Sequence, residues 1–130
     1  MTQTTPTGTT ATIAIVDDDD SVRSALESLL RSGGYKTRTY SSALAFLNAN
    51  VSTKTDCLVS DIQMPGMSGV EMCEQLVSMG FHIPTILITA YPGAAPPLTA
   101  ENPELVACLA KPCDADRLLS CIEGALLQKH

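Results

Sequence analysis

The residues best suited to do chemistry are acids that follow short apolar runs. Asp61 comes directly after the run Cys57–Ser60 and just before the turn-forming segment Met64–Gly69. Asp17 and Asp18 follow a second, β-branched run. Short apolar runs bounded by polar residues are typical of buried strands, so these carboxylates are expected at strand carboxyl ends. In an open parallel α/β sheet, that edge is where ligands bind.

A hydroxyl and an amine are expected at the same edge. Thr89 follows the apolar run Thr85–Ile88, and Lys111 closely follows Leu105–Leu109. Adjacent strands lie about 4.8 Å apart, so neighbouring strand ends bring acid, hydroxyl and ammonium groups together. Closely spaced carboxylates repel and raise one another's pKa unless positive charge intervenes. The ammonium group of Lys111 and a divalent cation are the natural sources of that charge.

The ligand types at this edge favour Mg²⁺. Oxygen-only ligands in a partly open site suit Mg²⁺, whereas zinc prefers histidine or cysteine, and His82 and His130 fall outside the predicted edge. An aspartate beside Mg²⁺, a lysine and a hydroxyl can attack phosphorus and accept the phosphoryl group as an acyl phosphate. In this hypothesis Thr89 donates to a phosphoryl oxygen only in the modified state.

Five strand-helix units are predicted to position these groups. The strands are expected at Thr12–Val16, Tyr35–Tyr40, Asp56–Ser60, Thr85–Ile88 and Leu105–Leu109. A first helix, with Val22 to Leu30 contributing one apolar face, is expected to stop at Gly33–Gly34, and a second is expected after a cap at Ser41 or Ser42. A third is expected from Ser68 to Gly80, with Val70, Cys73 and Val77 on one face, and the last starts at Asp114 or Asp116. This alternation predicts a flavodoxin-like α/β fold, a doubly wound five-stranded parallel sheet in the order 2-1-3-4-5 with helices on both faces.

One segment departs from this regular alternation. Tyr91–Pro103 contains four prolines, which are hostile to a long helix, so the fourth helix of the predicted fold is expected to be short or irregular.

Composition limits the function classes. The chain has 130 residues, 45% of them apolar, which predicts a single domain over residues 12–130 behind a disordered, threonine-rich tail at residues 1–11. The formal net charge of −6 opposes direct binding to nucleic acid.

With no secretory signal and no apolar run of membrane-spanning length, we expect a cytoplasmic protein that does not bind membranes. Its five scattered cysteines are expected to be free thiols.

Each of the chosen residues also has an ordinary structural explanation. Asp61 by itself is most simply a solvated loop acid, Thr89 a satisfied strand-end hydroxyl, and Lys111 a solvated charge. Asp19 and Asp20 are best explained as acids favoured at a helix amino terminus. Gly66 and Gly69 are expected to be structural, because turns with positive φ favour glycine. It is the combination at one sheet edge that favours a functional site.

Four stretches together resemble the receiver domain of bacterial two-component response regulators: IVDDDDSVRSALESLL, LVSDIQMPGMSGVEM, ILITA and AKPCDADRLL. The resemblance extends over about Ile13–Leu127 and is closest to receivers that precede a helix-turn-helix DNA-binding domain, which implies transcription regulation; no such domain lies in these residues. It also implies a histidine kinase as partner, an effector domain or output protein, and a homodimer. The resemblance implies that a receiver domain is not an enzyme, apart from phosphorylating and dephosphorylating itself.

The resemblance also implies roles for individual residues. Asp61 is the phosphoacceptor; Asp18 and Asp61 bind Mg²⁺ directly with the backbone carbonyl of Gln63; Asp17 helps through water; Thr89 is the switch hydroxyl; and Lys111 pairs with the phosphoryl group. Two features depart from the family pattern. Cys108 stands where most receivers carry an aromatic residue, and the proline-rich segment Pro92–Pro103 stands where they have their fourth helix.

Two other functions stay open at this point. Asp18–Val22 fits the D-x-D-x-[T/V] motif of aspartate-nucleophile phosphatases of the haloacid dehalogenase kind, in which Asp18 would be the nucleophile. The chain could also be a phosphorylation-independent interaction module that keeps the acidic pocket without using it.

Overall fold

The sheet has the predicted topology. The structure is a computed structural model that describes residues 11–50, 54–90, 104–111 and 113–128. Five parallel strands form one sheet in the order β2-β1-β3-β4-β5. Their bounds are β1 (Thr12–Val16), β2 (Lys36–Tyr40), β3 (Cys57–Asp61), β4 (Thr85–Thr89) and β5 (Leu105–Ala110). The predicted flavodoxin-like order is therefore confirmed, and Asp61 and Thr89 each form the last residue of a strand.

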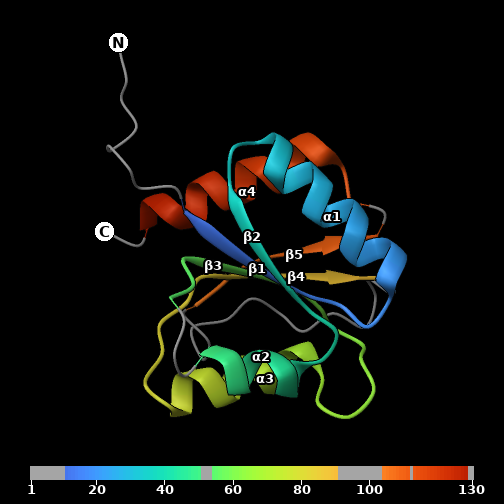
Figure 1. Cartoon of the computed structure of the whole chain (residues 1–130). Helices are drawn as coiled ribbons and strands as arrows, with labels where there is room; N and C mark the ends of the chain where they lie inside the picture. Colours follow the sequence, from blue (N-terminus) through green and yellow to red (C-terminus); the bar gives the residue numbers. More distant parts are fainter. Residues whose placement is uncertain (1–10, 51–53, 91–103, 112, 129–130) are drawn as a thin grey trace.

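Four helices within the described residues cover the sheet. They are α1 (Asp20–Ser32), α2 (Ala43–Asn50), α3 (Gly69–Ser78) and α4 (Ala115–Gln128). Helices α1 and α4 lie on one face of the sheet and α2 and α3 on the other (Figure 1). The short or irregular helix expected within Tyr91–Pro103 and the tail expected at residues 1–11 fall outside the described residues, apart from Ala11.

Alternating side chains of the central strands belong to two hydrophobic cores, one on each face of the sheet. Ile13 and Ile15 of β1 pack toward α1 and α4, whereas Ala14 and Val16 pack toward α2 and α3. Every residue of β3 and β4 is buried, as expected for parallel strands covered on both faces. In α3 the predicted inner position of Val77 is wrong: Val77 is 37% exposed. Its neighbour Leu76 is buried instead, and the buried residues Met72, Cys73 and Leu76 define the inner face of the helix.

Polar caps begin the helices shortly after the strand ends. Asp19 caps α1 by accepting from the backbone N–H groups of Ser21 and Val22, as expected for an acid at a helix amino terminus. Ser68 caps α3 in a reciprocal capping box with Glu71. Each cap therefore fixes the residue at which the loop ends and the helix begins.

The two capping alternatives are also resolved. Ser42 accepts from the N–H of Ala45 at 3.1 Å, and Asp114 accepts from the N–H of Arg117 at 3.0 Å. Ser42 and Asp114 are therefore the residues that cap α2 and α4.

Candidate functional site

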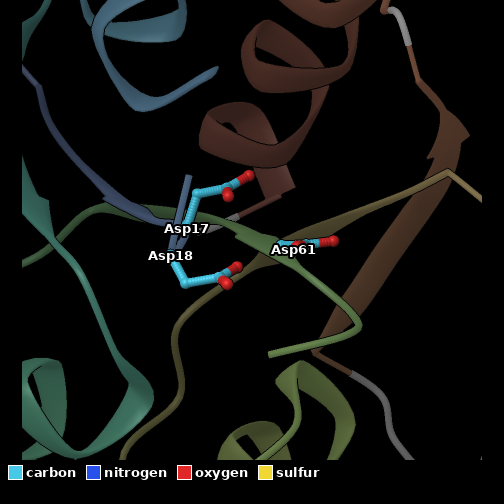
Figure 2. A group of neighbouring side chains, drawn as sticks. All are labelled: Asp17, Asp18 and Asp61. Atoms are coloured by element: carbon cyan, nitrogen blue, oxygen red, sulfur yellow. The ribbon is translucent and has the colours of Figure 1, made fainter. Parts of the chain in front are cut away.

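Three carboxylates meet where β1 and β3 end. Strand pairing aligns Val16 with Ser60, so Asp17 and Asp61 follow side by side. Carboxylate oxygens of Asp17, Asp18 and Asp61 all lie within 4.8 Å of one another, and Figure 2 shows the three side chains at the ends of these strands. Asp17 is 1% exposed and Asp61 6%, whereas Asp18 faces solvent. The pocket is thus buried at its base and open on one side.

Lys111 joins this pocket from the end of β5. Its Nζ lies 3.2 Å from Oδ2 of Asp17 and 3.4 Å from Oδ2 of Asp61. Its backbone N–H donates to the carbonyl of Thr89 at 2.7 Å, which extends the β4–β5 pairing by one residue. The structure therefore brings together four of the predicted site residues, from three separate strand ends.

The charges of these groups act on one another. Burial raises the pKa of the Asp61 carboxyl, and the negative charge of Asp17 raises it further; Lys111 opposes this shift, while Asp18 adds to it. Burial alone would lower the pKa of Lys111, but the contacts with Asp17 and Asp61 outweigh it and raise that pKa. One ammonium group therefore does not fully compensate the acids.

The residues present fit a divalent cation. Three carboxylates against one ammonium group leave two negative charges in the pocket. Oδ2 of Asp17 is buried and lies 3.2 Å from Nζ of Lys111, but it accepts no regular hydrogen bond from the described residues. A hard dication bound by oxygen ligands would satisfy both the charge and this oxygen, as Mg²⁺ does.

Thr89 lies at the same edge, and its side chain forms a hydrogen bond with Gln63. It is 1% exposed at the end of β4, next to β3. Its Oγ1 donates to Oε1 of Gln63 at 3.0 Å. Gln63 is two residues beyond Asp61, in the loop that leaves the site. The side chain of Gln63 had no predicted role, since nothing in the sequence links it to Thr89.

Arg23 also contacts the site and was not predicted. Its Nη1 donates to the backbone carbonyl of Asp17 at 2.6 Å, and the guanidinium group forms an ion pair with Asp20. Oδ1 of Asp17 in turn accepts from the N–H of Asp19 at 2.9 Å. These bonds hold the turn that carries the first two acids. In the sequence, the three-residue spacing of Asp20 and Arg23 on a helix could have indicated their ion pair.

The loop after Asp61 depends on two glycines for different reasons. Gly66 has φ of +80°, as predicted for a turn glycine. The same prediction was wrong for Gly69, which is not among the positive-φ glycines of the described residues. A Cβ atom on Gly69 would lie only 2.3 Å from the backbone oxygen of Asp61. Close backbone approach is therefore what requires glycine at that position.

Cys108 lies beside the site on β5. It is partly buried and packs with the cluster formed by Ile62, Cys73 and Leu87. Burial raises the pKa of its thiol, so it behaves as a small apolar side chain. The position that the family pattern gives to an aromatic ring is thus filled here by a much smaller group.

The second acid of the phosphatase-like motif lies away from the pocket. Asp20 is in the first turn of α1, where its side chain is exposed and paired with Arg23. The described cluster contains Asp17, Asp18 and Asp61 instead. His82 is also remote from it, with Nδ1 3.1 Å from Glu104.

The doubly wound parallel sheet with three acids and a lysine at its carboxyl edge agrees with the receiver class of signalling domains that the sequence resembles. The family model for the response regulator receiver domain matches residues 13–123, and the chain belongs to this family.

Individual proteins similar to this chain are also response regulators. The transcriptional regulatory protein FixJ of Azorhizobium caulinodans is 36% identical over 116 residues, which cover 88% of this chain and 54% of FixJ. The structure of the response regulator StyR superposes with a TM-score of 0.81 at 38% identity, covering 92% of this chain and 61% of StyR. The response regulator protein TrrA of Thermotoga maritima, solved in complex with Mg²⁺-BeF, has a TM-score of 0.77 at 25% identity, covering 89% and 99% of the two chains.

Family membership defines the general function. The chain is a phosphoacceptor signalling domain of the two-component type, and the phosphatase alternative is not favoured. It spans about half the length of the curated relatives it matches. Among the described residues, no helix is long and apolar enough to cross a membrane.

Proposed function

We propose that Asp61 accepts a phosphoryl group from a histidine kinase and that this modification switches the domain. The observation that carries the proposal is the position of the Lys111 ammonium group, within 3.4 Å of both Asp17 and Asp61. When Asp61 becomes an acyl phosphate, the charge of its own carboxylate is used in the new bond, and the Lys111 ammonium group is then placed to pair with the phosphoryl oxygens.

The proposed transfer moves one phosphoryl group between side chains. A carboxylate oxygen of Asp61 attacks phosphorus while the nitrogen–phosphorus bond of the kinase phosphohistidine breaks, and the departing imidazole takes up a proton. Lys111 neutralises charge on the phosphoryl oxygens as its contact with Asp61 is replaced. Hydrolysis of the acyl phosphate by water returns the domain to its starting state. This hydrolysis and self-phosphorylation from a small phosphodonor are the only reactions that the domain itself is proposed to carry out.

Mg²⁺ is the proposed cofactor. Asp18 and Asp61 would bind it directly together with the backbone carbonyl of Gln63, and Asp17 would act through water. When bound, Mg²⁺ supplies positive charge to the phosphoryl oxygens during transfer. The two uncompensated negative charges and the unsatisfied Oδ2 of Asp17 support this assignment. The Mg²⁺-BeF complex of the relative TrrA also supports it.

The output is proposed to pass to a further domain or a partner protein. The relatives FixJ and TdiR are transcriptional regulatory proteins, which supports an output in transcription regulation. Thr89 is the proposed switch hydroxyl, and Cys108 leaves more space behind it than an aromatic ring would. A homodimer of the phosphorylated domain is a further proposal.

The test uses a small phosphodonor. The folded chain is incubated with acetyl phosphate and Mg²⁺, and its intact mass is measured. The modified residue is then identified by borohydride reduction and peptide mapping. One phosphoryl group is expected, on Asp61, and Asp61→Asn is expected to remove it. Asp116→Asn, a change of an exposed aspartate on α4, is the matched control and should be labelled as the unmodified chain is.

Two outcomes would overturn the proposal. Label on Asp18 with Asp61 unmodified would support the phosphatase alternative. A folded chain that accepts no phosphoryl group from acetyl phosphate, and none from a phosphorylated histidine kinase domain, would support a phosphorylation-independent interaction module.

A further inference from the structure

The hydrogen bond between Thr89 and Gln63 has no role in the phosphoryl transfer proposed above. Oγ1 of Thr89 donates to Oε1 of Gln63 at 3.0 Å, across 26 residues of sequence. Thr89 is buried, whereas Gln63 belongs to the exposed part of the loop after Asp61. The bond therefore ties a strand-end hydroxyl to the segment that directly follows the proposed phosphoacceptor.

The backbone around Gln63 is held without help from its side chain. The N–H of Ile62 donates to the carbonyl of Ile88 at 2.9 Å, which continues the β3–β4 pairing past Asp61. The N–H of Gly69 donates to the carbonyl of Ile62, also at 2.9 Å, and closes the loop. Because these bonds fix the loop, a change in the Gln63 side chain should leave Asp61 and the backbone carbonyl of Gln63 in place.

A single hydroxyl proton cannot serve two acceptors fully. If Thr89 is to donate to a phosphoryl oxygen on Asp61, its bond to Gln63 must first be given up. We propose that the side chain of Gln63 is a latch that holds Thr89 in the unphosphorylated arrangement and so sets how readily phosphorylation switches the domain. This inference rests on the proposed function. Gln63 is in this sense a positioning residue that acts through Thr89.

The strength of the hydrogen bond between Thr89 and Gln63 sets the expected change in affinity for a phosphoryl mimic. A neutral hydrogen bond contributes about 0.5–1.5 kcal/mol net, which corresponds to about 2- to 13-fold in an equilibrium constant. Part of the Gln63 side chain is in water, so the lower half of that range is expected. Loss of the latch should therefore strengthen binding of a phosphoryl mimic by about 2- to 5-fold.

A double-mutant cycle tests the latch. The affinity for beryllofluoride at saturating Mg²⁺ is measured by calorimetry for the unmodified chain, Gln63→Met, Thr89→Val and the double variant. Gln63→Met keeps the side-chain length without an acceptor oxygen, and is expected to tighten binding. In the Thr89→Val background the same change is expected to have no effect. Gln75→Met, a change of an exposed glutamine on α3, is the matched control.

A second measurement needs no phosphoryl mimic. The ¹³C shift of the Thr89 methyl group reports its side-chain rotamer, and it is expected to change in Gln63→Met but not in Gln75→Met, without Mg²⁺ or beryllofluoride. An equal change in affinity in both Thr89 backgrounds, or an unchanged methyl shift, would overturn the latch while the proposed function stands. A folded, unmodified chain that neither binds beryllofluoride nor accepts phosphate from acetyl phosphate would overturn both.

Discussion

At 3.2 Å from Asp17 and 3.4 Å from Asp61, the Lys111 ammonium group lies between two carboxylates that would otherwise repel each other. Removing Lys111 would leave these two buried carboxylates without their nearby positive charge, so this lysine supports the fold of the edge as well as its chemistry. Where no cation is near, burial favours the uncharged form, as it does for the thiols of Cys73 and Cys108, whose pKa values it raises.

Cys73 provides a pH-dependent test at the residue scale. Burial raises the pKa of its thiol from the ordinary 9.0 to about 11, although a hydrogen bond with Thr85 opposes the shift. The unfolded chain therefore loses this proton first, and stability present below pH 9 is lost as pH rises toward 11. The expected loss from this group is about 2–3 kcal/mol, at about 1.4 kcal/mol per pH unit.

The measurement is urea unfolding of the unmodified chain and of Cys73→Ala between pH 8 and 11, followed by circular dichroism. The difference in unfolding free energy between the two should shift in favour of Cys73→Ala as pH rises. Cys73→Ser, which also lacks an ionising group in this range, serves as a control and should show the same trend. A difference that stays constant across this range would contradict the prediction.

At the scale of elements, the loop from β3 to α3 connects the proposed phosphoacceptor to the rest of the domain. It leaves the sheet at Asp61, turns at Gly66 and returns so closely that Gly69 lies against the backbone oxygen of Asp61. The capping box of Ser68 and Glu71 then begins α3. Because the loop is closed by backbone contacts, its shape depends on the absence of a side chain at one position.

Gly69→Ala is therefore expected to destabilise the domain. The added Cβ would lie 2.3 Å from a backbone oxygen, so the loop must shift, at a cost of about 2–3 kcal/mol. Gly124→Ala on α4 is the matched control: nothing lies within 4 Å of its added Cβ, and it should stabilise the helix by up to about 1 kcal/mol. Urea unfolding measures both. Equal midpoints for Gly69→Ala and the unmodified chain would show that the loop absorbs the methyl group without strain.

At the scale of the whole molecule, acidic groups dominate. The formal net charge is −6, and three carboxylates meet at one edge of the sheet. Folding brings these acids together, so the folded state carries a repulsion that the extended chain does not. A cation that binds only the folded state would relieve this repulsion and add stability that rises with the logarithm of its concentration once that exceeds the dissociation constant.

Mg²⁺ is accordingly expected to stabilise the whole domain. At ten times its dissociation constant the increment should be about 1.4 kcal/mol in unfolding free energy. Asp18→Asn should lose this increment, yet be no less stable than the unmodified chain in EDTA, because it removes one of three repelling charges. Thermal unfolding with and without Mg²⁺ measures both effects. An undiminished increment in Asp18→Asn would mean that the cation binds elsewhere, and Asp116→Asn should retain it.

Local patterns were sufficient for most of the architecture. Apolar runs with abrupt polar ends predicted the strands, and helical periodicity with capping residues predicted the helices, because both depend on neighbours in sequence. The strand ends then placed Asp17, Asp61 and Lys111 at one edge, since parallel strands in this order share a direction. The inner face of α3 was predicted wrongly at Val77, because a short helix offers few residues from which to judge its rotation.

The sequence by itself determined the fold class and predicted which acids and amine meet at one edge of the sheet. Only the tertiary structure decided what each group contacts. The bond from Thr89 to Gln63, the guanidinium group of Arg23 on the carbonyl of Asp17 and the approach of Gly69 to Asp61 have no signature in residue type alone. Such contacts depend on rotamers and backbone paths that are set only when separate strands and loops pack against one another.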